Sequence, residues 1–173
     1  MKGCKDEAWG IKVKIESAFK DIPYPGDENI VASDYQEALD VAEHFRGVRW
    51  MEFKDIPSKF LSMRYSGDIF WLTPKAFQYF LPIYMIQSLI DYKAADLLPG
   101  EIVTSFAPPP DKPGLIKQVS KKISLMNPAQ LNAILLYLEF FKREHSRDFS
   151  TWPINLAIAN IQQAISGLQS NPT

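Results

Sequence analysis

The stretch at residues 73–91, TPKAFQYFLPIYMIQSLID, constrains the fold more than any other part of the chain. Thr73 can cap a helix, and Pro74 has the fixed φ that suits the first helical position. The apolar side chains that follow point in every direction around a helix, and such a helix is normally buried. Pro82 removes one backbone hydrogen bond and is expected to kink the helix. We therefore predict a buried central helix, which the rest of the chain surrounds.

Helical periodicity recurs on both sides of this central segment. Residues 6–22 and 33–46 each carry an apolar stripe, and residues 151–168 carry a nearly ideal one. The sequence NPAQ at residues 127–130 has the order of a helix cap, a first helical proline and a capping-box glutamine. The same capping-box spacing begins the segment 33–46, and Gly47 can supply its left-handed stop.

Shorter stretches complete the expected fold. Residues 55–65 and 93–98 are predicted to form short helices, whereas 48–53 and 101–106 allow short strands. The sequence therefore predicts a mainly α fold, with five to seven helices around the central helix and at most a minor β pair. Its 173 residues suit a single domain, residues 1–173.

One low-complexity stretch, APPPDKPG at residues 107–114, interrupts the helical pattern. Its prolines favour polyproline II geometry. We interpret it as a stiff surface loop, and the alternative is a docking motif for an aromatic groove. The stretch is also the one plausible domain boundary, but the sixty or so residues beyond it would form only a small independent domain.

Composition limits the partners and the compartment. The net charge of −1 gives no general attraction to nucleic acid, so we expect no nucleic-acid partner. The central segment approaches the length of a membrane span, but its proline, glutamines and lysine favour a soluble core helix, and no membrane association is expected. The single cysteine fits a reducing compartment, and the N-terminus lacks the apolar run of a signal peptide. A cytoplasmic location is predicted.

The sequence lacks the motifs of common catalytic sites. It contains no phosphate-binding glycine loop, no G-x-S-x-G elbow, no H-E-x-x-H and no C-x-x-C. Cys4 has no histidine near it in sequence. Asp40 and His44 share a helix face, which leaves a metal or acid–base role as the alternative to an ordinary solvated face. We predict no catalytic residue, no metal ligand and no cofactor.

The turn YPGDEN at residues 24–29 is the most unusual polar cluster. Its carboxylates and amide can hold a cation or a cationic group of a partner. Alternatively, Asp27 and Asn29 bond their own backbone, as such residues do in turns. Tyr24, Asp27 and Asn29 are therefore candidate binding residues.

A second candidate cluster follows the helix predicted at 33–46. Arg46 and Arg49 place two guanidinium groups beside the indole of Trp50, an arrangement that suits an anion or an aromatic ligand. The alternative is a pair of charges at a helix C-terminus next to a core tryptophan.

Three segments, PYPGDENIV, FRGVRW and FWLTPKAFQYFLPIYM, form a pattern of a Y-P-G-D turn, a helix ending in F-R-G, and an L-T-P-x-A-F core helix. In this pattern the chain resembles a family of small bacterial proteins with a domain of unknown function. The resemblance covers roughly residues 15–98, with a looser echo in SLMNPAQLNAILLYLEF. Some family members have cysteines before F-R-G, and residues 32–38 have none here. The resemblance implies a shared fold and a bacterial source but no activity, and it marks Tyr24, Asp27, Asn29, Arg46, Trp50, Thr73 and Tyr84.

Two classes of function follow. The first is a non-enzymatic protein-binding module, such as an immunity or accessory protein that neutralises a toxin or effector. Small size, missing catalytic motifs and abundant aromatic residues favour it. The alternative is a small enzyme or ligand-binding domain that uses Asp27, Arg46 and Trp50. The candidate partner contacts are Arg46, Arg49, Trp50 and Tyr65.

Overall fold

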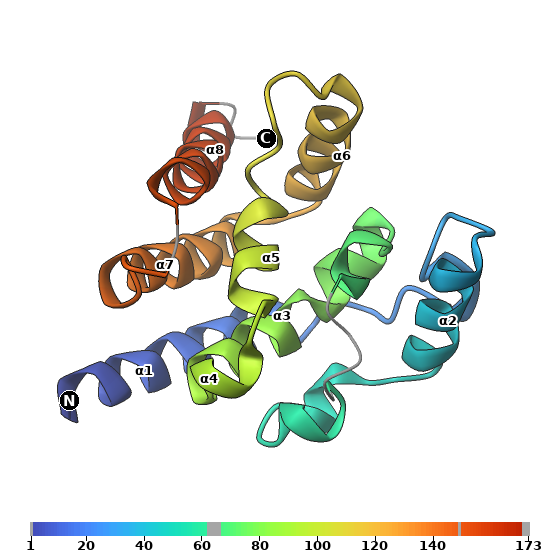
Figure 1. Cartoon of the computed structure of the whole chain (residues 1–173), viewed down its shortest axis with the longest axis horizontal. Helices are drawn as coiled ribbons and strands as arrows, with labels where there is room; N and C mark the ends of the chain where they lie inside the picture. Colours follow the sequence, from blue (N-terminus) through green and yellow to red (C-terminus); the bar gives the residue numbers. More distant parts are fainter. Residues whose placement is uncertain (1, 62–66, 149, 171–173) are drawn as a thin grey trace.

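The computed structural model describes residues 2–61, 67–148 and 150–170. Over these ranges the chain packs eight α-helices and four short 3-10 helices around one hydrophobic core, without a β-strand (Figure 1). The predicted mainly α fold is confirmed, with a single antiparallel bridge between Val31 and Leu72 as its extended pairing. The elements are α1 (Lys2–Phe19), η1 (Asp27–Asn29), α2 (Gln36–Phe45), η2 (Trp50–Phe53), η3 (Pro57–Lys59), η4 (Asp68–Phe70), α3 (Pro74–Ile90), α4 (Tyr92–Ala95), α5 (Leu98–Thr104), α6 (Pro113–Ser124), α7 (Pro128–Glu144) and α8 (Thr151–Ser170).

The central helix is confirmed as α3. The side chain of Thr73 caps it by accepting the backbone N–H of Ala76 at 3.2 Å, and Pro74 begins it. The helix continues through Pro82, and twelve of its seventeen residues are buried, including Phe80 at 0% exposure. It packs against α1, α4, α5 and α6 and against η2 and η3. A helix that is apolar on all sides needs such neighbours all around it to keep its side chains out of water.

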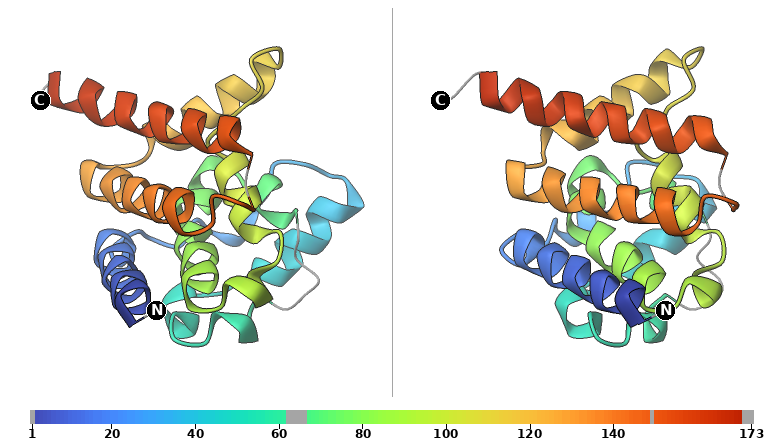
Figure 2. Two further views of the ribbon diagram at one scale, coloured as in Figure 1. Left: turned by 60° about the vertical axis from the view of Figure 1, so that its left-hand side comes forward. Right: turned by 90° about the vertical axis from the view of Figure 1, so that its left-hand side faces the viewer.

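Three long helices form one side of the molecule. Figure 2 shows α8, α7 and α1 lying one beside the next, with α7 in contact with both neighbours. The predicted capping box of α7 is confirmed: Asn127 and Gln130 each bond the other's backbone N–H. The side-chain amide of Gln130 also donates to the carbonyl of Ala18 at 3.3 Å, which ties the start of α7 to the end of α1. Among the described residues, no helix is both long and apolar enough to cross a membrane.

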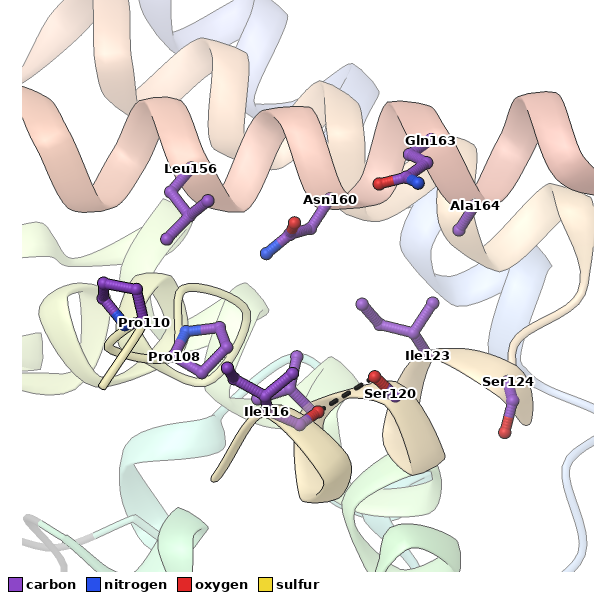
Figure 3. Close-up of a pocket in the computed structure, with 11 residues that line it drawn as sticks. Pro108, Pro110, Ile116, Ser120, Ile123, Ser124, Leu156, Asn160, Gln163 and Ala164 are labelled. Carbon is purple, nitrogen blue, oxygen red and sulfur yellow. Dashed lines mark hydrogen bonds between the residues drawn. The ribbon is translucent and has the colours of Figure 1, made fainter. Parts of the chain in front are cut away.

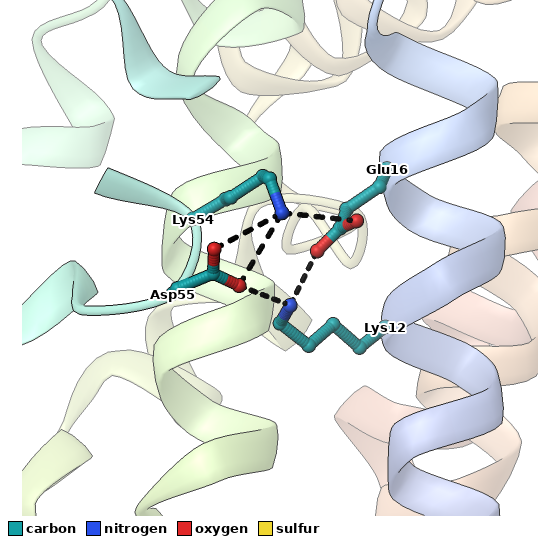
Figure 4. A network of polar contacts seen from close by, with 4 residues as sticks. All are labelled: Lys12, Glu16, Lys54 and Asp55. Carbon is teal, nitrogen blue, oxygen red and sulfur yellow. Dashed lines mark hydrogen bonds and ion pairs between the residues drawn. The ribbon is translucent and has the colours of Figure 1, made fainter. Parts of the chain in front are cut away.

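A four-charge network joins α1 to the segment that follows η2 (Figure 4). Lys12 is 2% exposed, and its ammonium bonds Glu16 and, at 3.0 Å, Asp55. Lys54 approaches the same two carboxylates, at 3.7 Å from Glu16 and 3.1 Å from Asp55. Burial lowers the pKa of Lys12, but the bonds to Glu16 and Asp55 outweigh it, so the pKa lies above its usual value. The ammonium therefore stays charged inside the protein.

The structure corrects several local expectations. The strand expected at 101–106 is wrong, because this stretch belongs to α5 and to the turn after it, where Ile102 is buried on a helix. The capping box expected at the start of α2 does not form: the hydroxyl of Ser33 accepts the N–H of Tyr35, and the helix begins later. The stretch 48–53, which allowed a short strand, instead contains η2 at its last four residues. The helix expected at 55–65 falls partly outside the described residues.

Candidate functional site

The turn at residues 24–29 meets the end of α2. The hydroxyl of Tyr24 donates to a carboxylate oxygen of Asp27 at 2.6 Å, and the N–H of Gly47 donates to both groups, at 2.8 and 3.2 Å. Gly47 has a φ of +67°, the left-handed stop predicted for this helix. The bond from Tyr24 lowers the pKa of Asp27, whereas burial and the bond to Asp27 raise the pKa of Tyr24 to about 12. Asp27 is thus ionised and clamps the end of α2.

Asn29 fastens the same turn to the central helix. Its side-chain amide donates to the carbonyl of Pro25 at 2.9 Å, and its own carbonyl accepts the hydroxyl of Thr73. The backbone N–H of Thr73 donates to Ile30 at 2.9 Å. The polar atoms of the turn therefore place α2 and the start of α3 relative to each other.

The other candidate residues do not gather into one open site. Arg46 is exposed and pairs with Glu43 at 3.3 Å. The hydrogen bond from Tyr24 is the main cause of the lowered pKa of Asp27, and the charge of Arg46 lowers it further. Arg49 is also exposed. Trp50, in contrast, is 1% exposed and lies in the core. Tyr65 lies outside the described residues.

The two histidines take part in ring stacking. His44 stacks on Phe60 with ring centres 4.4 Å apart, and burial lowers the pKa of His44. His145 stacks on Tyr92 with ring centres 3.6 Å apart. Asp40 accepts a bond from the side chain of Gln36 at 2.8 Å. In the part of the chain that the structure describes, no three metal-binding side chains cluster together.

A groove of about 470 Å³ opens between α6 and α8. Figure 3 shows the side chains of α8 pointing toward those of α6 across the groove, while the proline loop closes one end. The polar groups are a carboxamide pair on α8 and a serine pair on α6, and the remaining lining is aliphatic. The lining residues are Pro108, Pro110, Ile116, Val119, Ser120, Ile123, Ser124, Leu156, Asn160, Gln163 and Ala164.

The two walls of the groove differ in charge. Helix α8 contains no Asp, Glu, Lys, Arg or His in any of its twenty residues, and Trp152, one turn before Leu156, is 53% exposed. Helix α6 contains three lysines and no carboxylate. Lys117 and Lys121 are exposed, and each lies three residues before a serine of the groove wall. The solvent-facing side of a surface helix normally carries charged as well as polar residues, so the absence of charge from α8 is unusual.

The groove was not predicted from the sequence, because residues 113–124 were not predicted to form a helix. A signal was present: Ile116, Val119 and Ile123 have the i, i+3, i+7 spacing of an amphipathic helix, and Pro113 suits its first turn. Of the stretch interpreted as a surface loop at 107–114, Ala107 and Pro108 are buried, and its last residues begin α6.

Comparison with known proteins adds one finding. No curated protein and no solved structure matched the chain. The model of a family described as "Family of unknown function (DUF6714)" matches residues 8–160. This range contains the clamp at Asp27, the central helix, all of α6 and the first half of α8. The chain therefore belongs to DUF6714, a family of unknown function.

Proposed function

We propose that this chain is a non-enzymatic protein-binding module, an immunity or accessory protein that neutralises or assists a partner protein. The observation that carries the proposal is the groove between α6 and α8, one wall of which is a charge-free helix. The exposed Trp152 lies four residues before Leu156, on the side of α8 that continues this wall. The centres of protein interfaces are depleted of charged residues and enriched in aromatic ones. Tryptophan is also among the residues that most often dominate binding energy.

The candidate contacts change accordingly. Trp50 is left out of the proposed surface because its side chain is buried. Trp152 takes its place as the aromatic anchor, and the exposed Arg46 and Arg49 remain candidates for a peripheral contact. The same proposal places the module in the bacterial cytoplasm, in keeping with its family resemblance and its single cysteine.

Quantitative affinity purification tests the proposal. The tagged protein is compared with Trp152→Ala and with Ser120→Tyr, which fills the groove with a neutral side chain. Trp9→Ala is the matched control, since Trp9 is 60% exposed and lies on α1, separated from α8 by α7. We expect a stoichiometric partner with the wild type and with Trp9→Ala, and its loss with both groove variants. If Trp152→Ala and Ser120→Tyr recover the partner as well as the wild type does, the proposal is contradicted.

Neutralisation is tested with the gene products encoded beside this protein. If one of them is toxic when expressed alone, co-expression of the wild type should restore growth, and co-expression of Trp152→Ala should not. Elemental analysis and mass spectrometry of the purified protein test the alternative. A stoichiometric metal or a small molecule bound near Asp27 and Arg46 would overturn the binding-module proposal in favour of an enzyme or ligand-binding domain.

A further inference from the structure

We infer that the groove between α6 and α8 binds an acidic amphipathic helix contributed by a partner protein. The inference rests on the proposed protein-binding function and adds the chemistry of the occupant. Three features of the groove support it: its shape, the positive charge carried by α6 alone, and the polar side chains on its inner walls.

The shape of the groove suits a helix of a few turns. Its lining runs from Ile116 to Ser124 on α6 and from Leu156 to Ala164 on α8. At 1.5 Å per residue, each wall is about 12 Å long, so an occupant of two to three helical turns fills it. Both walls are helices whose backbone groups are bonded internally, and they offer no sheet edge to an extended peptide. Helices dock in such grooves through apolar anchors at i, i+4 and i+7.

The charge of the walls selects the sign of the occupant. Residues 111–125 contain four lysines and a single carboxylate, Asp111. Lys112, Lys117 and Lys121 are exposed, and among the described residues none of them has a carboxylate within 4.0 Å. Helix α8 adds no charge on the opposite wall. Glutamate and aspartate on the outer face of a docked helix would therefore meet lysines without a competing acid, which raises association rate and specificity.

Side chains on the inner walls can set the register of the occupant. The amide of Asn160 donates to the carbonyl of Phe106 at 2.8 Å, which fixes its side chain within the groove. The hydroxyl of Ser120 donates to the carbonyl of Ile116 at 2.9 Å, so its oxygen can accept a bond from the occupant. These groups lie on facing walls and favour one position of a polar side chain on the bound helix.

The probe is a stapled, fluorescently labelled peptide of about 15 residues with leucines on one face and glutamates on the other. Its counterpart carries lysine in place of every glutamate. By fluorescence anisotropy, we expect the full chain to bind the acidic peptide about fivefold or more tighter than the basic one. The double variant Lys117→Glu/Lys121→Glu should reverse this preference. Lys14→Glu/Lys20→Glu makes the same charge change on an exposed residue of α1 and on the exposed residue that follows this helix, and it should leave the preference unchanged.

Four outcomes would overturn the inference. In the first two, neither peptide binds, or both bind equally well. In the third, Lys117→Glu/Lys121→Glu keeps the preference of the wild type. In the fourth, a short DNA duplex displaces the acidic peptide. Sedimentation provides a further test, because a dimer of this chain that dissociates on Trp152→Ala would assign the groove to a second copy. If a groove-dependent partner is purified but the peptides are not discriminated by charge, the inference fails while the proposed function stands. If no partner depends on the groove, the proposed function itself fails.

Discussion

The ammonium of Lys122 lies 4.1 Å from the centre of the Phe77 ring, inside the contact between α6 and α3. Lys122 is 7% exposed, and burial lowers its pKa to about 8. Because the unfolded chain has a lysine pKa of about 10.4, it binds more protons than the folded protein between these two values. The free energy of unfolding should therefore rise as the pH increases from about 8 to 10, through the contribution of this group.

Lys122→Met tests this linkage. The variant removes a buried charge and keeps the apolar stem, so we expect it to raise the free energy of unfolding at pH 7 by about 1–2 kcal/mol. Above pH 10 the difference should shrink, because wild-type Lys122 is then neutral. Urea titrations at the two pH values measure the effect, with the exposed Lys121→Met as the control. An equal difference at both values would contradict the prediction.

Phe80→Ala should cost about 3–5 kcal/mol of the free energy of unfolding, because a buried phenylalanine loses transfer energy and leaves a cavity. Phe80 is 0% exposed, and its ring contacts those of Tyr24, Phe45 and Tyr79. Phe70 is 50% exposed, so Phe70→Ala serves as the control and should change the free energy little. Denaturant unfolding measures both, and a loss below roughly 1 kcal/mol for Phe80→Ala would place that side chain outside the core.

The clamp between Tyr24 and Asp27 predicts a pH-dependent coupling. Asp27→Asn should destabilise the protein at pH 7, because the neutral amide is a weaker acceptor for Tyr24 and Gly47. The folded state lowers the pKa of Asp27, so its contribution is present above the ordinary aspartate pKa and is lost as the pH falls through the folded value. The effect of Asp27→Asn should therefore shrink toward pH 3. In a double-mutant cycle, Tyr24→Phe and Asp27→Asn should be less than additive, whereas strict additivity would show no coupling.

Lys12→Met should lower the free energy of unfolding by about 1–2 kcal/mol. The substitution leaves Glu16 and Asp55 without their shared buried partner, although Lys54 still approaches both. Lys14→Met changes an exposed lysine of the same helix and should have little effect. Chemical denaturation of the two variants provides the comparison. Equal losses would mean that the buried ion network contributes nothing beyond an exposed charge.

The sequence predicted the fold where one local signal dominated. The cap at Thr73 and the all-round apolar surface identify α3, and the spacing of Asn127 and Gln130 identifies the start of α7. It failed at 101–106, because a short apolar run with Ile102 and Val103 suits a strand as well as one turn of a buried helix. Tertiary packing on α3 decides between them.

The candidate site was harder to predict than the fold. The polar residues of the 24–29 turn stand out in the sequence, yet their bonds to Gly47 and Thr73 span distances along the chain that no local pattern reveals. The burial of Trp50 likewise depends on helices far from it in sequence. The groove forms where α6 and α8 lie beside each other, so the sequence of neither helix alone predicts it.

The pairing of α1 with α7 also bears on how the chain folds during synthesis. The bond from Gln130 to Ala18 joins residues 112 positions apart. At a synthesis rate of about 5–20 residues per second, roughly 6 to 22 seconds pass between the synthesis of Ala18 at the end of α1 and that of Gln130 at the start of α7. Helix α3 is completed earlier and also packs on α1, so it can shield Ile15 and Phe19 in the interval. The central helix is then a temporary cover for the nascent N-terminal half as well as the final core.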